Sequence, residues 1–218
     1  MGIVVLVPQG AEYQAVKRGL PDRSDFTLIA IPAGLQPVRS FLAERSRDAL
    51  WSSVQQVIVM GLCGALNPVL QVGDRVLYQT CQNTSNQRWQ CKYDLNVNAK
   101  LVKAVNTNII VASKIDKQAL RSRSGCDVVD MEGIAILEFF QNLNIPVTML
   151  RVVSDDAAGD ISDLSSAIDA QGKLRAGKLA IGMIKEPRKA IRLIRGARTG
   201  LRALAGLAGD LWGDAVGG

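Results

Sequence analysis

The amino-acid sequence predicts an α/β domain in which helices cover both faces of a largely parallel sheet. Short, continuous runs of Val, Ile and Leu alternate along the chain with segments of helical spacing. Such runs are typical of strands buried on both faces. With 218 residues, 48% of them hydrophobic and 21% charged, the chain is long enough for one large domain and has an ordinary globular composition.

The first half of the chain is predicted to alternate between strands and helices. The predicted strands are GIVVLV at 2–7, FTLIAIP at 26–32, QVIVMGLCGAL at 56–66 and VGDRVLYQTC at 72–81. The third of these is expected to break into a glycine turn at GLCGAL. Segments 11–20 and 35–47 have helical spacing, whereas the sparse apolar residues of 82–94 indicate a loop.

The pattern continues to residue 155. Helices are predicted near 98–105 and over about 133–142, with strands at NIIVAS (108–113), DVVDM (127–131) and PVTMLRVVSD (146–155). In doubly covered parallel sheets, ligands bind beyond the carboxyl ends of the strands. The residues that follow the predicted strands are therefore candidates for a functional site.

Acidic and small residues gather at four of these strand ends. They are Glu12, the GLCGAL segment at 61–66, Met131 with Glu132, and Ser154 with Asp155. Taken singly, Glu12 is explained as an acid at a helix start and Asp155 as a helix N-cap. Glu132 is harder to explain in this way, because the apolar run GIAILEFF follows it and an unpartnered buried carboxylate costs several kcal/mol. Together these residues predict a site built from carboxylates.

The composition excludes several kinds of site. The chain has no histidine, which is the most common metal ligand and the usual base beside a nucleophilic Ser or Cys. Its four cysteines, Cys63, Cys81, Cys91 and Cys126, lack CxxC spacing, so we expect neither a metal site nor a disulfide framework. No apolar run approaches the roughly 18 residues of a membrane span and no signal peptide is evident, so a cytoplasmic protein is expected.

Four motifs in this order, GxCGAL, LxxGD, VDMEG and RVVSD, resemble the nucleoside phosphorylase and nucleosidase superfamily, which includes methylthioadenosine/S-adenosylhomocysteine nucleosidases. The resemblance implies a three-layer α/β/α sandwich around a twisted, partly closed mixed sheet. It also implies cleavage of the N-glycosidic bond of a purine nucleoside with release of adenine, by a homo-oligomer. No cofactor is implied, apart from phosphate as co-substrate in a phosphorylase.

The resemblance also implies roles for individual residues. Asp155 would be the general acid that protonates the leaving base at N7, and Glu132 would accept hydrogen bonds from the ribose hydroxyls. Met131 would pack under the sugar, and Glu12 would hold the attacking water. The remaining candidates for substrate binding are Cys63, Gly64 and Ser154.

The nucleophile distinguishes the two subclasses. Leu62 stands where many phosphorylases carry a phosphate-binding Ser or Thr, and Glu12 stands where nucleosidases place their water-binding glutamate, so hydrolysis is favoured. A phosphorylase that uses an arginine such as Arg39 stays the alternative. The stretch that corresponds to the family's base-binding loop, 112–125, lacks the usual aromatic residue, although a backbone contact near Ile115 or Asp116 would serve. That lack supports a further alternative, a non-catalytic protein that binds nucleosides or recruits partners to membranes.

The C-terminal region is strongly basic. Residues 173–202 contain ten Lys or Arg and one acid, and five arginines recur every three or four residues from Arg188 to Arg202. We therefore expect a domain over 1–186 and a basic amphipathic extension over 187–218. The extension is expected either to contact a membrane surface through 187–208 or to pack on protein, and not to bind nucleic acid. Its glycines weaken a helix, which suggests order acquired on binding.

The segment 169–194 is similar to the arginine-rich extension of hopanoid-associated phosphorylases. This looser resemblance implies another alternative, removal of adenine from adenosylhopane.

Overall fold

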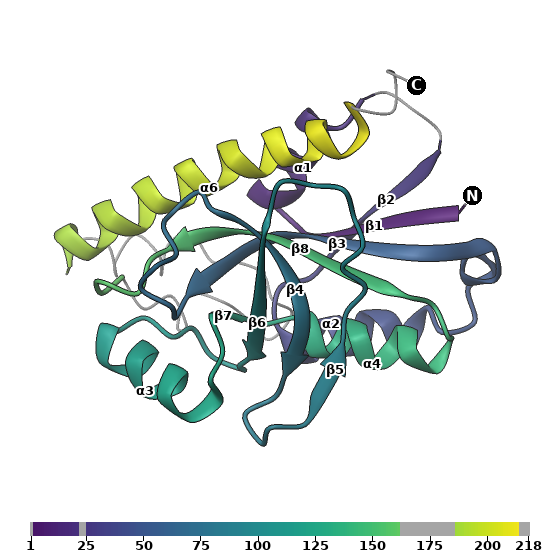
Figure 1. Ribbon diagram of the computed structural model, residues 1–218. Coiled ribbons are helices and arrows are strands. Elements are labelled where there is room, and N and C mark those ends of the chain that lie inside the picture. The colour runs from purple at the N-terminus through teal and green to yellow at the C-terminus, as the bar shows by residue number, and fades with distance from the viewer. Residues whose placement is uncertain (1, 22–24, 162–185, 214–218) are drawn as a thin grey trace.

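The computed structural model describes residues 2–21, 25–161 and 186–213, which form one eight-stranded mixed sheet with helices on both faces (Figure 1). The strands are β1 (Gly2–Pro8), β2 (Phe26–Ile31), β3 (Val54–Ala65), β4 (Arg75–Gln82), β5 (Arg88–Gln90), β6 (Lys100–Asn106), β7 (Val128–Asp130) and β8 (Val147–Asp155). The helices are α1 (Ala11–Gly19), α2 (Leu35–Glu44), α3 (Lys114–Ser124), α4 (Gly133–Asn142) and α6 (Pro187–Gly213), with a short 3₁₀ turn at Ala49–Ser53.

The sheet closes on itself around β8. The strand order is β2-β1-β3-β7-β6-β4-β5, and β8 pairs in parallel with β3 and antiparallel with β4. Strands β3, β7, β6, β4 and β8 therefore form a ring, from which β1 and β2 extend as an open wing. This arrangement confirms the partly closed mixed sheet that the motif resemblance implies, and it is less parallel than the apolar runs alone suggest.

The apolar runs of the strands serve two separate cores. In β1, Val4 and Leu6 face the core shared with α2 and α4, while Val5 and Val7 face the core shared with α1 and α6. Figure 1 shows the two pairs of helices on opposite sides of the sheet. Because side chains alternate between the faces of a strand, a strand covered on both sides needs apolar residues at every position.

Four predicted elements differ from the structure. Residues 100–106 form β6 rather than a helix, because Val102 and Ala104 alternate with the exposed Lys103 and complete the sheet between β4 and β7. The segment 108–113 is not a strand, and Ile109 in it is 66% exposed. GLCGAL does not form a turn, since β3 continues through it to Ala65, and the predicted loop 82–94 contains the short strand β5.

Helix α6 has the basic amphipathic character expected from the sequence, and it packs along α1 and the end of β8 (Figure 1). Its apolar side, with Leu204, Leu207, Ala208 and Trp212, belongs to the core of the protein. The division of the chain at residue 186 stays a prediction, and residues 169–185 of the hopanoid-like segment lie outside the described residues. No helix in the described ranges has the length and hydropathy to cross a bilayer.

Gly196 and Gly200 of α6 permit close packing, whereas the suggestion of order acquired on binding stays a prediction. A Cβ at Gly196 would overlap the carbonyl oxygen of Ser154, and one at Gly200 would lie 3.0 Å from Leu62. The helix therefore rests directly on the backbone at the end of β8. Gly206 is different, because it faces outward and a Cβ there would meet only the tip of Arg75, at 3.4 Å.

We expect Gly196→Ala and Gly206→Ala to change stability in opposite directions. The first should lower the free energy of unfolding by about 1–3 kcal/mol, because the added methyl forces α6 away from β8. The second should raise it by up to about 1 kcal/mol through helix propensity alone. Urea denaturation of both variants tests this, and equal effects would show that α6 does not rest on Ser154.

Candidate active site

All seven candidate site residues line a single cavity of about 170 Å³. They are Glu12, Cys63, Gly64, Met131, Glu132, Ser154 and Asp155. A larger cavity of about 600 Å³ shares Thr107 and the segment 109–111 with it. The structure thus brings the four predicted strand ends together, whereas the roles of the residues stay predictions.

Strand pairing explains why residues so distant in the sequence meet. Strands β1, β3 and β8 are parallel neighbours, so their carboxyl ends lie at the same edge of the sheet. Within β3 and β8, Gly64 is paired with Asp155 after a register shift, and Gly64 is also paired with Val129 of β7 on its other side. The motifs GLCGA, SD and VDMEG are therefore in direct contact through the backbone ladder.

The two glycines of GLCGAL leave gaps in the side-chain rows of β3. A Cβ at Gly61 would overlap the guanidinium of Arg151, and a Cβ at Gly64 would lie 3.1 Å from a carboxylate oxygen of Asp155. Neither glycine has a positive φ. The motif therefore provides room for two charged side chains in the middle of a strand.

Glu12 lies in the first turn of α1, where its Oε1 accepts a hydrogen bond from the backbone N–H of Leu62 at 2.7 Å. Burial raises the pKa of Glu12 from 4.5 to about 7, and the charge of Glu132 adds to the rise. A carboxylate with such a pKa can take up a proton near neutral pH.

Asp130 and Glu132 share one buried cation. The guanidinium of Arg151 is fully buried and lies 3.5 Å from Asp130 Oδ2 and 3.8 Å from Glu132 Oε2. Glu132 Oε1 also accepts from the backbone N–H of Gly34, at 2.8 Å. Burial raises the pKa of Asp130 to about 6, although the charge of Arg151 opposes the rise. Asp130 is thus a partner of Arg151.

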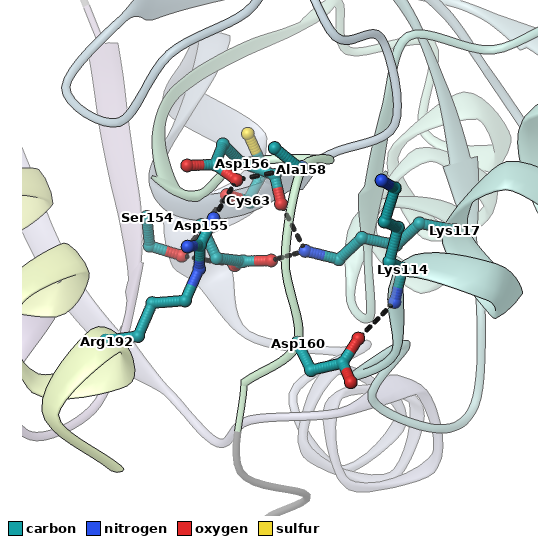
Figure 2. A network of polar contacts seen from close by, with 9 residues as sticks. All are labelled: Cys63, Lys114, Lys117, Ser154, Asp155, Asp156, Ala158, Asp160 and Arg192. Carbon is teal, nitrogen blue, oxygen red and sulfur yellow. Dashed lines mark hydrogen bonds and ion pairs between the residues drawn. The ribbon is translucent and has the colours of Figure 1, made fainter. Parts of the chain in front are cut away.

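Each carboxylate oxygen of Asp155 accepts a hydrogen bond from a side chain (Figure 2). The hydroxyl of Ser154 lies 3.0 Å from Asp155 Oδ1 and 3.2 Å from the carbonyl oxygen of Cys63. The ammonium of Lys117 donates to Asp155 Oδ2 and, at 2.8 Å, to the carbonyl oxygen of Asp156. Burial raises the pKa of the Cys63 thiol well above its usual range, so Cys63 is not a thiolate nucleophile here.

The wall that faces the predicted base is aliphatic. Residues 109–111 and Ile161 line it, and the backbone N–H of Ile161 donates to the carbonyl oxygen of Ala112 at 3.0 Å. Most of the predicted base loop folds instead as α3, where Ile115 is 76% exposed and does not line this cavity. Asp116 of the same helix lines the larger cavity, and a backbone contact near Ile115 or Asp116 stays a prediction.

Sequence reasoning missed Lys117. Lys117 and Leu120 are three residues apart in α3 and both are buried, so the helical spacing that places Leu120 inward also places Lys117 inward. A lysine on the apolar face of an otherwise polar helix is a signal that a helical projection of 114–124 would reveal.

The cations near the candidate residues lie outside the smaller cavity, because a neighbouring cavity of about 510 Å³ is lined by Ser154 and Asp155 together with Arg188, Arg192 and Arg195. None of the described residues that line the smaller cavity is Lys or Arg. Arg39 pairs with Glu138 at 2.8 Å and lines the larger cavity. Across the described ranges, no three His, Cys, Asp or Glu side chains are grouped as a metal site would require.

Comparison with known proteins agrees with this fold. Residues 93–185 match the family model described as the phosphorylase superfamily. No curated protein sequence gives a significant match. Together with the fold, the family match confirms the resemblance to this superfamily that the motifs indicate.

Solved nucleosidases have the same fold at low identity. The chain is 17% identical to Arabidopsis thaliana 5′-methylthioadenosine nucleosidase, with a TM-score of 0.68 and coverage of 100% of this chain and 96% of that one. It is 14% identical to Helicobacter pylori 5′-methylthioadenosine/S-adenosylhomocysteine nucleosidase (TM-score 0.70, 98% of both chains). It is 15% identical to futalosine hydrolase of the same bacterium (TM-score 0.66, 96% and 98%).

We expect Glu12→Gln to stabilise the protein at alkaline pH. Because the pKa of Glu12 is about 7 in the folded chain and near 4.5 when unfolded, its contribution to stability is present below pH 4.5 and is lost as the pH rises through 7. Glutamine keeps the acceptor for Leu62 but carries no charge. Urea unfolding should show a gain of about 1–3 kcal/mol at pH 8 and little change at pH 4.5.

The exposed Glu44, at the end of α2, provides the control. Glu44→Gln should leave stability unchanged at both values of pH. A Glu12→Gln variant that is no more stable than the parent at pH 8 would contradict a raised pKa at this site.

Proposed function

We propose that this chain is an enzyme that hydrolyses the N-glycosidic bond of an adenosyl nucleoside, such as methylthioadenosine, and releases adenine. The observation that carries the proposal is Glu12. Its carboxylate is fixed at the edge of a cavity, its pKa is raised to about 7, and none of the described residues that line this cavity is cationic. Such a site suits a neutral water better than a phosphate.

Cleavage of this bond places positive charge on the sugar and negative charge on the departing base, and an enzyme must stabilise both. Glu132 accepts hydrogen bonds from the ribose 2′- and 3′-hydroxyls, with Met131 packed under the ring. Glu12 and Glu132 place negative charge near the anomeric carbon as it becomes cationic. Glu12 takes a proton from the water that attacks this carbon.

Asp155 delivers a proton to N7 of the base. Cys63 and Gly64 form the floor between the sugar and the base, and Ser154 fixes one carboxylate oxygen of Asp155. The cavity of about 170 Å³ accommodates only part of a nucleoside, because sites for drug-sized ligands are about 300–1,000 Å³. The adjoining cavity of about 600 Å³ provides the remaining room.

The other candidate functions differ in what they require. A phosphorylase needs donors for phosphate, and Arg39 is engaged by Glu138. Adenosylhopane carries the same adenosyl group and would be cleaved by the same residues. A non-catalytic nucleoside-binding protein would not need a glutamate with a pKa near 7. We include a homo-oligomer in the proposal, because Ile109 lines both cavities and is 66% exposed, and a second copy would cover it.

The decisive assay is adenine release from methylthioadenosine with and without phosphate. We expect release without phosphate, and kcat/KM should rise with pH through about 7 as Glu12 loses its proton. Glu12→Gln and Asp155→Asn should each lower kcat at least about 100-fold. Glu44→Gln, at an exposed position that lines neither cavity, serves as the control. A strict need for phosphate would establish a phosphorylase, and absence of turnover of any adenosyl nucleoside would refute the proposal.

We also propose that the exposed side of α6 contacts an anionic membrane surface. Arg188, Arg195, Arg198 and Arg202 are exposed on this side, and Ile191 among them is 50% exposed. The apolar side of the helix is engaged in the protein core, so the contact is electrostatic with shallow insertion of Ile191.

Co-sedimentation with vesicles of phosphatidylserine and phosphatidylcholine tests this contact. Changing the four exposed arginines to Gln should reduce binding at least about tenfold, since each cation contributes about 1 kcal/mol. Changing the exposed Lys17 and Arg18 of α1 to Gln is the matched control. Removal of α6 is not a clean test, because it opens the core. Undiminished binding by the quadruple variant would refute the contact.

A further inference from the structure

Lys117 is a fully buried lysine for which the proposed mechanism has no use. Its side chain comes from α3 and is 0% exposed, and its ammonium contacts the carboxylate of Asp155 and the carbonyl oxygen of Asp156 (Figure 2). We propose that Lys117 supplies the proton that Asp155 passes to the departing base.

The burial of Lys117 depends on Asp155. An ammonium removed from water is costly unless a partner charge and hydrogen bonds replace its hydration. Within the part of the chain that the structure describes, Asp155 is the one acidic side chain that bonds this ammonium, and Asp156 offers only its backbone oxygen. The two side chains therefore form one unit that contains a transferable proton.

The surrounding contacts hold this unit in one geometry. The carboxylate of Asp156 pairs with Arg192 of α6, and the carboxylate of Asp160 accepts from the backbone N–H of Lys114 in α3 (Figure 2). The loop after β8 is thus attached to a helix on each side. Asp155 has Lys117 on one oxygen and Ser154 on the other, and it lines the cavity in which the base would lie.

The proton balance is simple. As the bond between C1′ and the purine breaks, its electron pair moves into the base, and N7 takes a proton from Asp155. Asp155 takes a proton from Lys117, which becomes a neutral amine, so the negative charge on the base and the positive charge on Lys117 disappear together. Lys117 regains a proton from solvent through Asp155 when the product leaves. Lys117 thus acts on the substrate only through Asp155.

This inference rests on the proposed function, so its test uses two substrates of the full-length protein. The first is methylthioadenosine, whose base needs a proton to leave. The second is a 4-nitrophenyl riboside with the same 5′ substituent, whose leaving group departs as a stable anion and needs none. A defect in proton delivery affects the first alone, whereas a structural defect affects both.

We expect Lys117→Met to lower kcat/KM for methylthioadenosine at least about 100-fold and to change that for the nitrophenyl riboside by less than about threefold. Lys117→Arg keeps the positive charge and should fold even if Lys117→Met does not. Because a guanidinium does not release its proton, this variant should also lose at least about tenfold on methylthioadenosine. The exposed Lys114, one turn earlier in α3, provides the control, and Lys114→Met should behave like the parent.

Each contrary result has a distinct meaning. Parallel loss on both substrates, or full activity of Lys117→Arg on methylthioadenosine, would overturn the relay while the glycosidase proposal stands. Full activity of Lys117→Met would also overturn the relay alone. A parent protein that cleaves neither substrate would refute the proposed function, and the relay with it.

Discussion

The buried guanidinium of Arg151 is the interaction on which the rest of the site depends. Its burial requires carboxylate partners, and Asp130 and Glu132 supply them from the end of β7. It also requires free space beside Gly61, so this position of β3 has no room for a side chain. With both partners so placed, the charge of Glu132 adds to the effect of burial in raising the pKa of Glu12. The positive charge of Arg151 thus offsets the mutual repulsion of Asp130, Glu132 and Glu12.

The position of β8 depends on helices from opposite sides of the sheet. Helix α6 rests on the backbone of Ser154 through Gly196, and α3 reaches Asp155 through Lys117. The site is therefore not confined to the strand ends that the motifs identify. It includes a helix whose basic composition suggests an independent appendage.

The sequence predicted the layers, most elements and seven of the fifteen residues that line the cavity, because apolar runs and strand-end acids depend on local patterns. Prediction from the sequence failed where contacts with distant segments of the chain determine the structure. Residues 100–106 have weak helical spacing, and pairing with β4 and β7 makes them a strand. From the sequence alone, Lys117 is expected to be exposed to solvent, because its partner Asp155 is distant in the chain. The glycines at 61 and 64 suggested a turn. This prediction failed because the side chains that occupy the space beside these glycines come from another strand, which the local sequence does not reveal.

Residue 62 makes its contact with Glu12 through the main chain, and this affects how the site can diverge. This contact needs only a backbone N–H, which any non-proline residue provides. Drift at residue 62 would leave the glutamate in place while altering the side chain that faces the cavity. A substitution at residue 62 would therefore reshape the cavity without removing the backbone contact that holds Glu12.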